Sequence, residues 1–82
     1  MTSEMIEKFI ANKGRNGNAV NIHFKERSTV NGMFIEGKDF NELKSKNFWR
    51  IVSSTYMEEW KKTANMELAR IYNGNVFTRL SD

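Results

Sequence analysis

Aromatic and basic side chains interleave in two segments of this 82-residue chain, KSKNFWR at residues 44–50 and EEWKK at residues 58–62. Exposed aromatic rings can stack on nucleobases while Lys and Arg hold phosphates, so both segments carry the residue types that a single-strand nucleic-acid site needs. We expect RNA to be the preferred ligand. The residues expected to neutralise phosphates are Lys44, Lys46, Arg50, Lys61 and Lys62, and the expected stacking ring is Trp60.

The two tryptophans also allow other interpretations. Trp49 lies in a segment of aromatic and β-branched residues, where a core position is the commoner outcome. Trp60 is flanked by four charged residues, so we expect it to be partly exposed and able to anchor a protein interface. The alternative function is therefore a protein-interaction or self-assembly module that uses Trp60, Tyr56 and the last strand. Both functions predict a homo-oligomer, because a small barrel with unpaired edge strands readily pairs with its copies.

The residues that catalysis usually requires are scarce. The chain has one histidine, no cysteine and no glycine-rich phosphate loop, so we expect no enzymatic activity, no metal site and no cofactor. Glu58 and Glu59 are neighbours whose side chains must diverge in either a strand or a helix, which favours solvated surface charge. His23 lies between Ile22 and Phe24 and is expected on the polar face of a strand.

The length and the net charge of the chain limit its domain number and the classes of ligand that it can bind. A chain of 82 residues holds one small domain, and 39% apolar with 28% charged residues is typical of a folded domain. A net charge of +3, from 13 Lys and Arg against 10 Asp and Glu, permits polyanion binding without requiring it. The start of the chain carries Glu4 and Glu7 and no apolar run, so neither a signal peptide nor a membrane span is expected. We expect a cytoplasmic location.

The first element expected is a helix over about residues 3–12. Met5, Ile6, Phe9 and Ile10 form one apolar stripe, and Thr2 or Ser3 can cap the helix. The glycine- and asparagine-rich residues 14–18 are expected to form a loop.

Two strands should follow, joined by a charged turn at residues 25–28. Val20, Ile22 and Phe24 alternate with polar residues, and residues 30–35 supply the return strand. The Asn31-Gly32 pair allows either a bend within that return strand or a type I′ hairpin turn. We favour the bend, because a turn at Gly32 would place the charged residues 25–28 inside a strand.

Later elements are less clearly marked. Residues 37–47 are expected to form a connecting loop held by Phe40 and Leu43, and residues 48–54 a central strand. Residues 55–65 fit either a helix, from the spacing of Tyr56 and Trp60, or a turn and bent strand extension, which we favour. Residues 66–80 fit a strand, a turn at Asn73-Gly74 and a closing strand, or a helical turn before the last strand.

Together these elements predict a mainly β (α+β) fold as one domain, residues 1–82. A short N-terminal helix would precede a small, strongly bent antiparallel barrel of four to five strands over about residues 19–80. Contacts between the segments near residue 20 and residue 80 would close the barrel.

The segment at residues 19–37, AVNIHFKERSTVNGMFIEG, resembles the entry to an Sm-like or SH3-like small barrel. In the bacterial Sm-like RNA chaperone Hfq, an N-terminal helix precedes an alternating strand, a polar turn and a strand bent at a glycine. By that resemblance residues 20–24 are the first strand, Glu26 and Arg27 the turn, Gly32 the bend and residues 48–52 the third strand. The tyrosine-lysine-histidine RNA-contact motif of that chaperone is missing here, so the resemblance implies a fold and assigns no RNA-contact residue.

Overall fold

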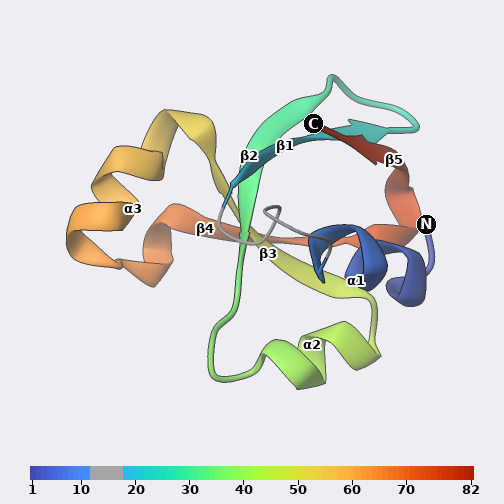
Figure 1. Ribbon diagram of the computed structural model, residues 1–82, viewed down its shortest axis with the longest axis horizontal. Helices are drawn as coiled ribbons and strands as arrows, with labels where there is room; N and C mark the ends of the chain where they lie inside the picture. Colours follow the sequence, from blue (N-terminus) through green and yellow to red (C-terminus); the bar gives the residue numbers. More distant parts are fainter. Residues whose placement is uncertain (12–17) are drawn as a thin grey trace.

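The chain forms a five-stranded antiparallel sheet in the order β4-β3-β2-β1-β5, shown in Figure 1. A computed structural model describes residues 1–11 and 18–82. The strands are β1 (Ala19–Phe24), β2 (Val30–Ile35), β3 (Phe48–Ser53), β4 (Ala69–Asn73) and β5 (Phe77–Ser81). The α-helices in the described residues are α1 (Ser3–Ala11), α2 (Phe40–Ser45) and α3 (Met57–Thr63), and the 3₁₀ turns are η1 (Ser54–Tyr56), η2 (Met66–Leu68) and η3 (Gly74–Val76).

The N-terminal helix and the first two strands confirm their sequence predictions. The hydroxyl oxygen of Thr2 accepts a hydrogen bond of 3.2 Å from the Met5 amide, so Thr2 caps α1. Ile6 and Ile10 are buried on one face of the helix, as the apolar stripe predicts. The expected end of the helix at Asn12 and the loop expected from residue 14 lie outside the described residues, apart from Asn18.

Both faces of β2 are covered, because hydrophobic clusters form on the two sides of the sheet. Phe34 belongs to the main cluster, to which α1 contributes Ile6 and Ile10. Met33 and Ile35 alternate with Phe34 and belong to a second cluster that α3 covers. Figure 1 shows α1 and α3 on opposite sides of the sheet. Residues 33–35 therefore read as a continuous apolar run rather than an alternating one.

Gly32 lies inside β2, opposite Val20 of β1 and Ser53 of β3. This pairing excludes the two-residue turn and agrees with a glycine within a curved strand (Figure 1). A Cβ atom at Gly32 would lie 2.8 Å from Ile51 Cγ2 and 2.8 Å from the carbonyl oxygen of Val52. The absence of a side chain is what lets β3 approach β2 here.

Two segments differ from their sequence predictions. The connecting loop expected at residues 37–47 contains a helix, α2, in which Phe40 packs against the main cluster and Leu43, three positions later, is half-buried. The bent strand extension favoured for residues 55–65 is wrong, because η1 and α3 form there instead. The physical reason is the second cluster, since a helix brings Met57 and Trp60 onto the buried side chains of β2 and β3.

The expected contact between the segments near residue 20 and residue 80 is present as the pairing of β1 with β5. Ile22 of β1 lies opposite Leu80 of β5, and Asn21 lies opposite Ser81. For residues 66–80, the sequence fitted either two strands joined by a turn or a helical turn before the last strand. The structure combines the two, because β4 is followed by the helical turn η3 and then by β5. The strands β4 and β5 stand at the two ends of the sheet order.

Trp49 is a core residue, with 2% of its surface exposed. Its indole nitrogen donates a hydrogen bond of 2.8 Å to the side-chain oxygen of Asn47. Asn47 is itself buried and has a positive φ of 62°, and its backbone oxygen accepts a hydrogen bond of 2.8 Å from Gly74. The indole group is thus satisfied inside the core, which leaves Trp49 unavailable for base stacking.

Candidate nucleic-acid interface

Two of the expected phosphate-binding cations are engaged by carboxylates. Lys44 Nζ lies 2.5 Å from Glu7 Oε2, which ties α2 to α1, and 5.6 Å from the centre of the Phe40 ring. Arg50 of β3 forms an ion pair with Asp39, and only 21% of its side chain is exposed. A phosphate would have to compete with these carboxylates, so both cations are less available than the sequence suggested.

The ion pair of Arg50 also determines the chemistry of Asp39. The hydrogen bond from the guanidinium holds the pKa of the Asp39 carboxyl below its ordinary value of 3.8. Asp39 occupies the N-cap position of α2 but makes no side-chain cap, because its oxygen accepts from Arg50 instead. Arg50 is therefore a structural link between β3 and the start of α2.

The other predicted residues lie on two separate helices. Lys46 follows α2 and forms an exposed ion pair of 3.7 Å with Glu42. Lys61 and Lys62 are exposed in the last turn of α3, where positive charge complements the helix dipole. Trp60 is half-buried and packs on the second cluster. Figure 1 shows α2 and α3 apart from one another, so the six residues do not form one patch.

A different set of cationic and aromatic residues does come together, at the end of β1. The guanidinium carbon of Arg27 lies 5.0 Å from the centre of the Phe24 ring and 5.7 Å from that of the Tyr72 ring. The two rings contact each other at 5.7 Å between centres. We call this group and its neighbours Lys25, Arg70 and Ile71 the Arg27 surface. This surface joins the β1–β2 turn to β4, although 45 positions separate Arg27 from Tyr72 along the chain.

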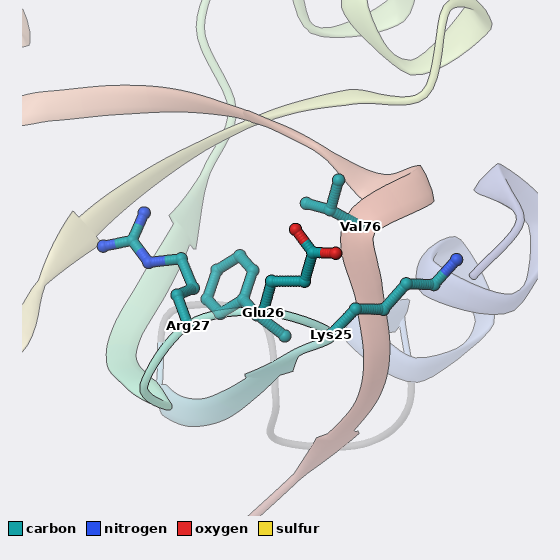
Figure 2. Close-up of a pocket in the computed structure, with 5 residues that line it drawn as sticks. Lys25, Glu26, Arg27 and Val76 are labelled. Atoms are coloured by element: carbon teal, nitrogen blue, oxygen red, sulfur yellow. The ribbon is translucent and has the colours of Figure 1, made fainter.

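Two hollows share Arg27. One, of about 490 Å³, lies between Arg27 and the β4 residues Arg70, Ile71 and Tyr72. The other, of about 400 Å³, is shown in Figure 2 and is lined by Phe24, Lys25, Glu26, Arg27 and Val76. Its wall is held in place because the Lys25 amide donates a hydrogen bond of 3.1 Å to the carbonyl oxygen of Val76. The surface thus has two concave sites, one between the charged turn and β4 and one between the turn and η3.

Among the residues that the structure describes, the cations of the Arg27 surface form no ion pair with a carboxylate. Within residues 1–11 and 18–82, the recorded ion pairs engage neither Lys25, Arg27 nor Arg70. Ile71 is 51% exposed on β4, and Val76 is also exposed beside the turn. Sequence analysis assigned residues 25–28 only to a turn, and it placed Arg70 and Tyr72 in a segment that fits either a strand or a helical turn, with no functional role. A charged turn directly after an aromatic strand residue was the available signal.

His23 and the adjacent pair Glu58 and Glu59 are the other residues that the sequence analysis considered for chemistry. His23 Nε2 lies 2.9 Å from Ser81 Oγ and its Nδ1 lies 3.2 Å from Thr29 Oγ1, which places the ring among hydroxyl groups. Glu58 and Glu59 are both exposed in the first turn of α3. In the part of the chain that the structure describes, no three His, Cys, Asp or Glu residues gather as metal ligands, and no helix is long and apolar enough to span a membrane.

Comparison of the chain with protein-family models, with curated proteins and with solved structures gives no match.

Proposed function

We propose that the protein is a non-enzymatic binding module that binds single-stranded nucleic acid, with RNA preferred, through the Arg27 surface. The observation that carries this proposal is the position of the Arg27 guanidinium over the rings of Phe24 and Tyr72. Single-strand binders combine cations that hold phosphates with flat groups on which bases stack, and a guanidinium plane can serve as such a flat group.

Electrostatics supports the same surface. Lys25, Arg27 and Arg70 contribute three positive charges, and within the described residues only Glu26 in the β1–β2 turn lines the same hollows with negative charge. Because no ion pair between described residues holds these cations, a phosphate does not have to displace a carboxylate. Lys61 and Lys62 add exposed positive charge on α3, which attracts a polyanion at longer range.

The Sm-like resemblance favours RNA as the ligand. The features on which it depends are a helix, an alternating strand, a polar turn and a glycine within the next strand, and each is present in the described residues. Membership of that family remains a prediction from pattern, and so does the cytoplasmic location.

Titration of fluorescently labelled oligonucleotides tests the proposal. We expect a mixed-sequence single-stranded RNA to bind more tightly than a duplex of the same sequence, and to compete effectively with single-stranded DNA. Its affinity should fall with added salt at a slope of about −0.7 for each phosphate contacted, on logarithmic axes. Equal affinity for duplex and single strand, or no binding at low salt, would contradict the proposal.

A second candidate function is self-assembly through the sheet edges. β4 and β5 each pair with only one strand of the described sheet, and β4 exposes Ile71 at its surface. An unpaired edge with an exposed apolar side chain favours pairing with a second strand. Light scattering should then show an oligomer that Ile71→Lys dissociates, whereas a monomer at high protein concentration would argue against this function. Tyr56, which is exposed, and half-buried Trp60 offer a second contact surface on the helical side.

A further inference from the structure

We propose that the hollow beside Glu26 binds a guanine base, and that the Glu26 carboxylate recognises the Watson–Crick edge of that base. This inference rests on the proposed function and adds a base preference to it. The hollow has a volume of about 400 Å³ and is bounded by the apolar side chains of Phe24 and Val76 and by the charged side chains of the turn. A nucleobase needs such a place, apolar on its faces and polar at its edge.

Among the described residues that line this hollow, Glu26 is the one acidic group. Figure 2 shows its carboxylate reaching across toward Val76, while Lys25 and Arg27 extend to opposite sides. Within residues 1–11 and 18–82, no recorded hydrogen bond or ion pair engages the Glu26 carboxylate. Both of its oxygens are therefore available to a ligand.

A carboxylate accepts hydrogen bonds and donates none, so it selects bases by the donors they present. Guanine presents two adjacent donors, N1–H and the N2 amino group, which match the two carboxylate oxygens. Adenine and cytosine each present one amino group next to a ring nitrogen that repels the second oxygen. Uracil presents one N–H between two carbonyl oxygens. Guanine is thus the base that can occupy both oxygens of Glu26.

The flanking cations favour a guanine within a strand over a free nucleotide. Lys25 and Arg27 lie on either side of Glu26 in the turn, so a base seated between them has positive charge toward both of its neighbouring phosphates (Figure 2). Arg70 extends the positive charge along the neighbouring hollow. A free nucleotide has a single phosphate group and can use only part of this arrangement.

The test uses uridine oligonucleotides that differ at one central base. We expect the guanine oligonucleotide to bind at least about fivefold more tightly than the adenine, cytosine and all-uridine versions. Replacing guanine by hypoxanthine, which lacks the N2 amino group, should remove most of this preference. Guanosine monophosphate should compete only weakly, because it lacks the second phosphate contact.

Glu26→Gln separates base recognition from charge. A carboxamide accepts with its oxygen and donates with its nitrogen, and each of the four bases presents an adjacent donor and acceptor that fits such a group, so the preference for guanine should be lost. The matched control is Glu59→Gln on α3, which removes the same charge from an exposed position. It should strengthen binding to all four oligonucleotides alike and leave the guanine preference unchanged.

The outcomes distinguish this inference from the proposed function. Binding of all four oligonucleotides with equal affinity would overturn guanine recognition and leave single-strand binding intact. A guanine preference that survives Glu26→Gln would overturn the role of Glu26. Binding of guanosine monophosphate as tightly as the oligonucleotide would overturn the strand as ligand, and absence of binding by every oligonucleotide would overturn the proposed function itself.

Discussion

The guanidinium of Arg27 lies over the ring of Phe24, with 5.0 Å between the guanidinium carbon and the ring centre. The Tyr72 ring is within 5.7 Å of the same carbon, so one cation contacts two aromatic side chains from different parts of the sheet. Contacts of this kind at exposed sites contribute about 0.5–1 kcal/mol. The arrangement restrains Arg27 while leaving it without a carboxylate partner among the described residues.

Replacing Arg27 should weaken RNA binding by loss of both charge and planarity. We expect Arg27→Gln to lower affinity for single-stranded RNA about tenfold and to reduce the salt slope by about 0.7. Arg27→Lys should keep the slope and recover only part of the affinity, because an ammonium group has no stacking plane. Lys38→Gln, which removes an exposed charge between β2 and α2, is the control. An equal loss in Lys38→Gln would show that net charge alone determines binding.

Double substitutions can show whether the Arg27 surface or the basic end of α3 contributes more to RNA affinity. Removing two charges from the Arg27 surface, with Arg27→Gln and Arg70→Gln together, should reduce RNA affinity more than Lys61→Gln and Lys62→Gln together. Both pairs change net charge by the same amount, and only the first removes cations that line the hollows. Fluorescence anisotropy at one fixed salt concentration measures the difference. A larger effect of the α3 pair would place the binding site on the helix instead.

A side chain at Gly32 should destabilise the fold. The Cβ of Gly32→Ala would lie 2.8 Å from two atoms of β3, one of them a backbone oxygen, so the strands must move apart at a cost of about 1–3 kcal/mol. Gly37→Ala is the matched control, because its nearest neighbour is the end of the flexible Met66 side chain at 3.2 Å. Urea unfolding compares the two variants. Equal stability of both variants would contradict the close approach of β3 at Gly32.

Acid should weaken the link between Asp39 and Arg50. The hydrogen bond from Arg50 is the main cause that lowers the folded-state pKa of Asp39. The stabilisation that the ionised Asp39 carboxylate gives the fold is therefore fully present above pH 3.8, the ordinary pKa, and is lost as the pH falls through the lower folded-state pKa. Asp39→Asn should be less stable than the wild type near neutral pH, and the difference should shrink below about pH 4. We expect a small effect, since the pair is partly exposed. Unfolding measured across this pH range would contradict the account if the difference stayed constant.

The strands were predictable from sequence where one rule decided them. Val20 and Ile22 alternate with polar residues because β1 has one buried face, and the main cluster confirms that pattern. The same reasoning did not identify the helix α3, because a bent strand also fitted residues 55–65. Its signal is the spacing of Met57 and Trp60 together with acids in the first turn and bases in the last turn, but the apolar side of β2 that it covers becomes evident only in three dimensions.

The candidate site depends on tertiary structure even more strongly. Sequence analysis selected cations by their proximity to tryptophan along the chain, and folding paired Lys44 with Glu7 and Arg50 with Asp39. The approach of Arg27 to Tyr72 results from the pairing of β1 with β5 and from the short η3 connection to β4. No local spacing records that approach, so single-sequence reasoning could name residue types suited to a candidate surface but could not show that Arg27 and Tyr72 come together.

The central claim is tested most directly by mapping the amide and side-chain NMR shifts of isotopically labelled protein during titration with single-stranded RNA. The account predicts that the largest shifts fall on the β1–β2 turn, on Arg70 to Tyr72 of β4 and on η3, with smaller changes on α3. Shifts concentrated on Trp60, Lys61 and Lys62, or no shifts at saturating RNA, would contradict it.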